Sequence, residues 1–141
     1  MKWAVISDIH ANLMALQEVV NHIKTQGVNG ILCTGDLVVF GPHPNECVEL
    51  IFSLLRERWD KRCMMGNNDQ AVVLNRHSEG LSRIAIVSQK WTSRVVSAEN
   101  RLRLSRLSKA PIIYKNHWTI VHGTLSDPIG EFTYMTLLKK V

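Results

Sequence analysis

Four short polar motifs carry the residues of this chain that could do chemistry. They are Asp8-Ile9-His10, Gly35-Asp36 followed by Gly41, Gly66-Asn67-Asn68-Asp69, and His122-Gly123. Carboxylate, imidazole and amide groups are the ligands with which proteins hold hard or borderline divalent cations. Each motif follows a stretch with the composition of a β-strand. Because strand ends meet at one edge of an α/β layer, we expect the four motifs to form one metal site.

The segments between the motifs predict an α/β fold. Short apolar strands are expected at residues 2–7, 30–34 and 62–65, and each leads into a motif. Apolar residues recur at helical spacing after Leu13, and again after Pro44, which suits the first turn of a helix. Strands that alternate with helices favour parallel pairing with right-handed connections.

The second half of the chain has a different pattern. Residues 70–109 predict two or three helices, one of them with apolar residues at helical spacing, namely Ile84, Val87, Trp91 and Val95. Residues 112–115 and 118–121 then predict two strands joined by a hairpin turn. The second of these strands leads directly to His122.

Length and composition limit the classes of protein to consider. With 141 residues, 45% of them hydrophobic, the chain can bury one ordinary core, so we expect a single domain. No apolar run approaches the roughly 20 residues that span a bilayer, and Asp8 interrupts the N-terminal run before a signal-peptide core could form. We therefore expect a soluble, cytoplasmic protein.

Cysteine usage and net charge say less about function. Cys33, Cys47 and Cys63 are an odd number, form no CxxC pair and lie in apolar segments, which favours buried reduced thiols over a redox or zinc role. The net charge of +5 bears on solubility and on the electrostatic attraction of anionic partners, and it supports phosphate chemistry only weakly.

Each motif taken alone also has a purely structural interpretation. An Asp-x-His triplet such as the one at Asp8 occurs by chance in many proteins, and Asp36 could cap a helix or form an Asx-turn. A carboxylate at the end of a buried strand does, however, need a cation or several hydrogen-bond donors. Residues 66–69 could be a tight turn in which Asp69 caps the next helix. A lone histidine such as His122 is more often structural, although its neutral imidazole suits a metal.

Together, the order and spacing of the motifs resemble those of the calcineurin-like metallophosphoesterases, in particular their small bacterial and archaeal phosphodiesterases. The combination of Asp-x-His, Gly-Asp with a following glycine, Gly-Asn-x-Asp and His-Gly is specific to that superfamily. Residues 41–47 also resemble the segment that follows the second motif in this branch. The resemblance extends from residue 1 to about residue 135.

The resemblance implies a layered sandwich of two mixed sheets flanked by helices, with a two-metal site. By match to the family's motifs, Asp8 and His10 bind the first cation, Asp36 bridges both, and Asn67 and His122 bind the second. Such cations lie about 3.5–4 Å apart, hold a bridging hydroxide and polarise a phosphoryl group. The implied reaction is hydrolysis of phosphodiester or phosphoanhydride bonds. Manganese is the expected metal, with iron, zinc, nickel or magnesium as alternatives.

One departure from the family concerns Asn68. Many members carry a histidine at this position, which protonates the leaving group or contacts the phosphate. Asparagine cannot act as a general acid, so we expect Asn68 at most to donate a hydrogen bond to the leaving group or phosphate. Loss of acid assistance costs ~10²–10⁴-fold in rate, least for good leaving groups. The sequence therefore favours diesters or phosphoanhydrides over alkyl monoesters as substrates.

A second departure concerns the end of the chain. The family's last motif, Gly-His-Thr-His or similar, supplies a histidine to each metal, but no histidine follows His122 in this sequence. We therefore expect residues 1–141 to be one phosphoesterase domain that lacks this C-terminal portion and has an incomplete second sheet. An open sheet edge favours a homo-oligomer, and the missing ligands favour reduced activity unless a second chain supplies them.

Two other classes of function remain open. A non-catalytic metal-binding or phosphate-binding module of the same fold would share every motif, so only turnover separates it from an enzyme. A nucleic-acid-binding domain is the other, and it would use the basic residues Lys90, Arg94, Arg101, Arg103, Arg106 and Lys109. Leucines interleave with these residues, which favours an ordinary solvated helix surface. A steep salt dependence of DNA or RNA binding would indicate the contrary.

Overall fold

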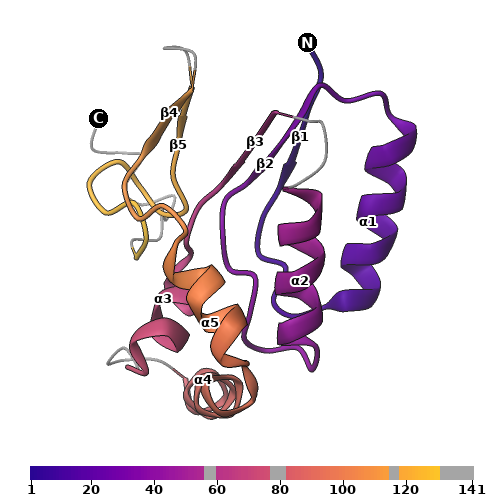
Figure 1. Cartoon of the computed structure of the whole chain (residues 1–141). Helices are drawn as coiled ribbons and strands as arrows, with labels where there is room; N and C mark the ends of the chain where they lie inside the picture. Colours follow the sequence, from indigo (N-terminus) through magenta and orange to yellow (C-terminus); the bar gives the residue numbers. More distant parts are fainter. Residues whose placement is uncertain (56–59, 77–81, 115–117, 131–141) are drawn as a thin grey trace.

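The computed structural model describes residues 1–55, 60–76, 82–114 and 118–130 (Figure 1). These residues form the predicted α/β fold, with a three-stranded parallel sheet and a separate two-stranded antiparallel sheet. In chain order, the elements are β1 (Trp3–Ile6), α1 (Leu13–Thr25), β2 (Gly30–Cys33), α2 (Pro44–Leu54), β3 (Asp60–Cys63), α3 (Asn67–Leu74), α4 (Arg83–Val95), α5 (Ala98–Ser105), β4 (Ile112–Tyr114) and β5 (Trp118–Ile120).

The parallel sheet brings the ends of its strands to one edge. Its order is β1-β2-β3, and Cys33 at the end of β2 lies opposite both Ile6 at the end of β1 and Cys63 at the end of β3. Helices α1 and α2 lie along one side of this sheet and the β4-β5 hairpin along the other, while α3, α4 and α5 gather beyond the strand ends (Figure 1). The loops that carry the first three motifs therefore leave the sheet together.

Apolar packing holds these layers in place. The larger core cluster joins both sheet-covering helices to the strand-end loops and α5, and includes Leu16, Val20, Leu37, Val48, Ile51, Met65 and Leu104. A smaller cluster joins the two sheets through Leu32, Met64, Tyr114 and Ile120. The second cluster fixes the position of the hairpin, and with it the loop that follows β5.

The largest differences from the predicted helix and strand ends are at β3 and α3. Strand β3 begins and ends two residues earlier than expected, and Met64 instead makes an isolated bridge to Ser108. Helix α3 begins inside the third motif, so that Asn67, Asn68 and Asp69 form its first turn rather than a loop. The predicted hairpin turn falls at residues 115–117, which lie outside the described residues.

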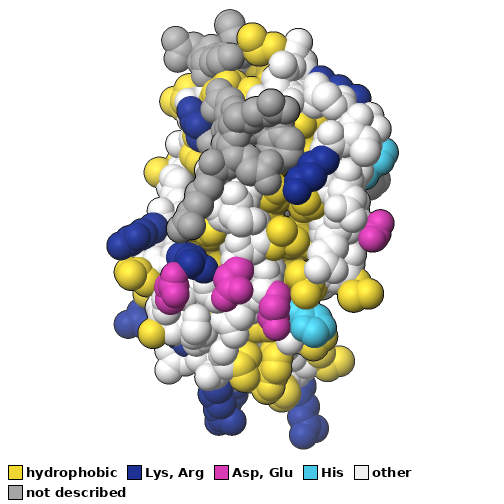
Figure 2. Space-filling view, turned by 45° about the vertical axis from the view of Figure 1, so that its right-hand side comes forward, with side chains coloured by type: hydrophobic (Ala, Val, Ile, Leu, Met, Phe, Trp, Pro, Cys, Tyr) yellow, Lys and Arg dark blue, Asp and Glu magenta, His cyan; other side chains and the backbone are white. Residues whose placement is uncertain are grey.

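Helix α4 is amphipathic, but its apolar stripe faces outward. Ile84 and Val87 are 76% and 58% exposed, whereas Gln89 and Thr92 on the opposite face are buried. Figure 2 shows hydrophobic side chains gathered on the lower part of the surface, at the end where α4 lies in Figure 1. The helix thus turns polar side chains toward the core.

The cysteines lie where their apolar segments predict, in or near the interior. Cys33 and Cys47 are buried, Cys63 is half-buried, and none of the three forms a disulfide. Burial, and secondarily the charge of Glu46, raises the pKa of Cys47 to about 12, so this thiol stays protonated at neutral pH. Within the described ranges, no helix has the length and apolar character needed to cross a membrane.

Candidate metal centre

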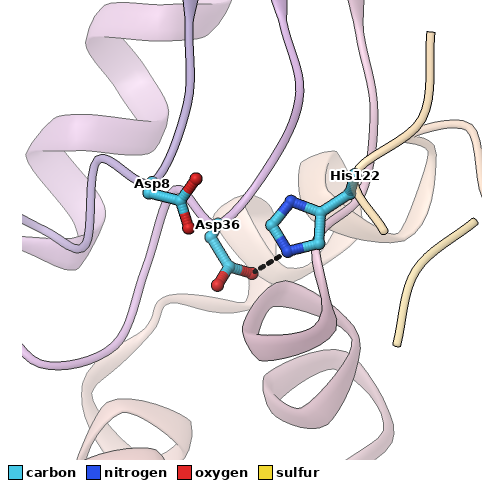
Figure 3. Close-up of side chains that lie close together, drawn as sticks. All are labelled: Asp8, Asp36 and His122. Atoms are coloured by element: carbon cyan, nitrogen blue, oxygen red, sulfur yellow. Dashed lines mark ion pairs between the residues drawn. The ribbon is translucent and has the colours of Figure 1, made fainter. Parts of the chain in front are cut away.

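Three of the predicted ligands lie together at the edge where the strands end. Asp8, Asp36 and His122 each offer one ligand atom, and these atoms lie within 4.8 Å of one another (Figure 3). They follow β1, β2 and β5, so the centre joins both sheets. The carboxylate of Asp36 points toward the imidazole of His122, with 3.6 Å between Oδ1 and Nε2.

The two remaining predicted ligands extend this centre on either side of Asp36. His10 Nε2 lies 3.6 Å from Asp8 Oδ1 and 3.9 Å from Asp36 Oδ2. On the other side, Asn67 Oδ1 lies 3.0 Å from His122 Nε2. Donor atoms at about 2.1 Å from one octahedral cation lie roughly 3 Å apart, so both groups are close to ligating spacing. The two oxygens of Asp36 face different groups of donors.

Backbone carbonyls orient both imidazoles. His122 Nδ1 lies 2.9 Å from the carbonyl oxygen of Thr34, and His10 Nδ1 lies 3.5 Å from that of Val38. A carbonyl oxygen can only accept a hydrogen bond, so a ring proton on Nδ1 satisfies each of these contacts. With the proton there, the lone pair on Nε2 faces the carboxylates and, for His122, the side-chain oxygen of Asn67, an arrangement of acceptors that a bound cation would satisfy.

The backbone around these ligands is in an unfavourable conformation. Asp8, His10 and Asp36 have φ angles of 52°, 49° and 54°, in the left-handed region that costs non-glycine residues of order 1–3 kcal/mol. Hydrogen bonds between the first two motif loops hold this geometry. The N–H of Asp8 donates to the carbonyl of Gly35 at 3.1 Å, and that of His10 to the carbonyl of Asp36 at 2.9 Å. Such strain persists where the surrounding structure over-determines it, and it is enriched at functional sites.

Asn68 binds the central carboxylate. Its backbone N–H donates to Asp36 Oδ1 at 2.9 Å, and its side-chain Nδ2 donates to Asp36 Oδ2 at 2.6 Å. Both residues are buried, with 7% of Asn68 and 2% of Asp36 exposed. The amide predicted to contact a leaving group is therefore engaged with Asp36 in this structure.

Asp69 braces the loops that carry the centre. Its carboxylate accepts hydrogen bonds from the N–H groups of Leu37 at 2.9 Å, Val38 at 3.2 Å and Gly66 at 3.0 Å. Gly66 is the N-cap residue of α3, so the capping role that the sequence left open is present. Burial, and secondarily the charge of Asp36, raises the pKa of Asp69 to about 7, against the lowering effect of the three donors.

The sequence pattern did not reveal three polar residues that support the ligands. Ser7 Oγ donates to Asp8 Oδ2, and Thr34 Oγ1 donates to Ser7 Oγ at 2.6 Å. Gln89 Nε2 donates to Asn68 Oδ1 at 3.0 Å. Neither hydroxyl belongs to a recognisable motif. For Gln89, the available signal was a run of polar residues at helical spacing opposite the apolar stripe of α4.

An open groove adjoins the centre on the His10 side. The ring of Phe40 meets that of His10 edge-on, with 4.8 Å between centroids, and the N–H of Phe40 donates to Ser88 Oγ at 2.6 Å. The groove has a volume of about 560 Å³, and its apolar lining comprises Phe40, Pro42, Ile84, Val87 and Trp91. An apolar surface therefore begins beside one of the predicted ligands.

Comparison with known proteins assigns the family. The model of the calcineurin-like phosphoesterases matches residues 1–139, which is nearly the whole chain. The chain belongs to the calcineurin-like phosphoesterase family. An uncharacterised protein of Methanocaldococcus jannaschii is 39% identical to this phosphoesterase chain over 116 residues, covering 81% of the chain and 44% of that protein.

Solved structures of similar proteins have the same fold. A metallophosphoesterase from Sphaerobacter thermophilus is 34% identical, with a TM-score of 0.74, over 95% of this chain and 51% of that one. A hypothetical protein from Pyrococcus horikoshii OT3 is 22% identical, with a TM-score of 0.75, over 91% of this chain and 57% of that one. This phosphoesterase chain thus spans about half the length of the relatives that it matches.

Proposed function

We propose that the chain holds two divalent cations and hydrolyses phosphodiester or phosphoanhydride bonds. The observation that carries the proposal is the placement of Asp36, whose two carboxylate oxygens face different groups of donors. In this proposal, Asp8 and His10 complete one cation site, and Asn67 and His122 complete the other. Membership of a family of metal-dependent phosphoesterases supports the same conclusion.

The donor set fits divalent transition metals. Each proposed site has three protein donors that mix oxygen and nitrogen, which suits manganese, with iron, zinc, nickel or magnesium as alternatives. Three protein donors leave coordination positions open for water and substrate, as in catalytic zinc sites. The carboxylates of Asp8 and Asp36 lie within 4.8 Å of each other, and a cation would relieve their repulsion.

The chain's own residues contribute position and orientation to the reaction. Two bound cations would supply Lewis-acid polarisation of the phosphoryl group and a nucleophile at neutral pH. Asn68 holds the shared carboxylate in one rotamer through two hydrogen bonds. The groove beside Phe40 offers an apolar surface on which an aromatic leaving group could rest. Good leaving groups need no general acid, so diesters and anhydrides should react faster than alkyl monoesters.

Turnover of a chromogenic diester tests the proposed reaction. With manganese, the purified chain should release nitrophenolate from bis(4-nitrophenyl) phosphate, lose activity on chelation and regain it when manganese is restored. An Asp36→Asn variant should be inactive, since it weakens the group shared by both sites. A Glu18→Gln variant removes an exposed carboxylate of α1 and should match the wild type. A panel in which alkyl monoesters reacted fastest would contradict the substrate class.

Calorimetric titration with manganese separates binding from catalysis. The wild type should bind two equivalents, and Asp36→Asn should weaken both, whereas Glu18→Gln should weaken neither. Two sites without turnover would identify a catalytically impaired chain or a metal-binding module, and would overturn the proposed enzyme. No binding in the wild type would overturn the metal centre itself.

The contacts of the basic residues favour a structural role for two of them over nucleic-acid binding. Arg101 donates to the carbonyl oxygens of Val72 and Ser93, and Arg103 pairs with Glu99. Two of the six basic side chains considered for nucleic-acid binding therefore bind other groups of the same chain. Their contacts agree with an ordinary helix surface.

A further inference from the structure

A buried chain of side-chain hydrogen bonds connects α4 to the metal centre. Gln89 Nε2 donates to Asn68 Oδ1 at 3.0 Å, and Asn68 Nδ2 donates to Asp36 Oδ2 at 2.6 Å. Only 1% of Gln89 and 7% of Asn68 are exposed, so water competes little for these bonds. These hydrogen bonds thus connect Asp36 to α4, a helix that contains none of the four motifs.

The orientation of α4 points to the same connection. The helix places Ala85, Gln89 and Thr92 in the interior while leaving Ile84 and Val87 largely exposed. Burying a primary amide costs free energy unless it is hydrogen-bonded, so this arrangement is stable only where Gln89 has polar partners. Asn68 supplies one partner, and α3 and α4 are packed against each other.

The direction of the hydrogen bonds matters for Asp36. The Gln89 donor holds the Asn68 oxygen toward α4, which leaves the Asn68 nitrogen to face Asp36 Oδ2. If the Asn68 amide rotated by half a turn, its oxygen would face the carboxylate and repel it. Asp36, which can only accept, and Gln89, which donates in this arrangement, therefore favour the same orientation of the Asn68 amide.

We infer that Gln89 is a positioning residue of the metal centre, which acts through Asn68 on the carboxylate of Asp36. This inference rests on the proposed metal function of Asp36. It also gives Asn68 a role different from leaving-group contact, because Asn68 holds the shared ligand. Partners of metal ligands typically change metal affinity about 10- to 100-fold when they are removed.

Manganese titration of a matched pair of variants tests the inference. Gln89→Met keeps the length of the side chain but removes the donor, and should weaken manganese binding about 10- to 100-fold with the number of sites unchanged. Thr92→Val is the control, because Thr92 lies on the same buried face of α4 and its hydroxyl has no hydrogen-bond partner among the residues that the structure describes. It should leave the affinity within about twofold of the wild type, since the lost hydroxyl makes no bond to the centre.

A double-mutant cycle distinguishes positioning from general loosening of the core. In an Asn68→Ala background, Gln89→Met should change manganese affinity less than about twofold, because its effect passes through Asn68. Gln89→Glu places an acceptor opposite the Asn68 oxygen, and should weaken binding at least as much as Gln89→Met. A folded Gln89→Met protein that binds manganese like the wild type, or an unchanged effect in the Asn68→Ala background, would overturn the inference.

Nuclear magnetic resonance of the metal-free chain tests, independently of metal binding, whether Gln89 orients the Asn68 amide. The side-chain amide signals of Asn68, assigned with an Asn68→Ser variant, should be protected from exchange and should shift and lose protection in Gln89→Met. Unchanged signals would show that Gln89 does not orient the Asn68 amide, and would overturn the inference. A wild type that bound no manganese would instead overturn the proposed function, and the amide signals would still report whether Gln89 orients Asn68.

Discussion

At the scale of single residues, the centre depends on close approach of the motif loops. A Cβ atom at Gly66 would lie 2.1 Å from Asp36 Oδ1 and 2.3 Å from the Asp36 backbone nitrogen. Gly35 has a φ of +106°, and a Cβ there would lie 2.4 Å from the nitrogen of Gly66. Both glycines are required because the second and third motifs touch backbone to backbone.

Replacing Gly66 with alanine tests this packing. Gly66→Ala should lower the free energy of unfolding by about 1–3 kcal/mol through overpacking, and should weaken manganese binding at least tenfold by displacing Asp36. Urea unfolding and calorimetry measure the two effects. Gly27→Ala is the control, because Gly27 has a φ of +60° with open space around it. It should cost roughly 1 kcal/mol in backbone strain and leave manganese affinity unchanged.

Residue types and order allowed the proximity of these side chains to be predicted, but not the residues that support them. Asp8, Asp36 and His122 were predicted as ligands because their motifs follow strands in a recognisable order, and the structure brings them together. Gln89 could not be predicted in the same way. Its partner Asn68 is 21 positions away, and a hydrogen bond between two amides leaves no spacing pattern in a single sequence.

At the scale of elements, the side chain of Asp69 links the segments that follow β2 and β3. The carboxylate of Asp69, in the first turn of α3, satisfies three backbone donors, two of them in the loop after β2. Without Asp69, those N–H groups would be buried without partners. The relative position of the second and third motifs therefore depends on this residue.

Removing the Asp69 carboxylate tests that dependence. Asp69→Ala should lower the free energy of unfolding by about 3 kcal/mol or more, because each buried unpaired donor costs roughly 1–3 kcal/mol. Urea unfolding at pH 8 keeps Asp69 ionised, above its raised pKa of about 7. Asn12→Ala, which removes one exposed N-cap bond of α1, should cost about 1 kcal/mol. Equal losses in the two variants would contradict the bracing role.

Periodicity predicts the elements better than their orientation. The spacing of Ile84, Val87 and Trp91 correctly indicates a helix, but says nothing about which side of that helix meets the core. Orientation is decided by partners that are distant in sequence, here the amide of Asn68 and the packing of α4 against α3 and α2. The parallel sheet was easier to predict, because its strands are apolar runs that alternate with helices.

At the scale of the whole molecule, apolar surface gathers between the two sheets. A groove of about 520 Å³ runs between β1 and β5, and its lining includes Trp3, Val5, Leu32 and Trp118. Among the described residues, β1 pairs only with β2 and β5 only with β4, so each strand has an unpaired edge. Apolar surface beside open strand edges favours association with another chain.

We predict that the chain self-associates through this surface. Sedimentation velocity over a tenfold concentration range should show a reversible increase in mass. Val5→Lys should reduce association, because Val5 is 65% exposed on the edge strand β1 and a lysine there opposes strand pairing. Val19→Lys adds the same charge to exposed α1 and should have no effect. A wild type that stays monomeric, or variants that behave alike, would contradict the prediction.

Under the proposed function, the placement of His122 would link metal supply to the amount of folded protein. Asp8 and Asp36 follow strands of the parallel sheet, whereas His122 follows the hairpin, so these side chains come together only after both sheets have docked. A cation that binds this assembled centre, and not the unfolded chain, shifts the folding equilibrium by mass action. In a cell, the lifetime of this chain would then depend on the free concentration of its metal. A low metal concentration would increase the unfolded fraction and so expose the chain to proteolysis, in addition to lowering its catalytic activity.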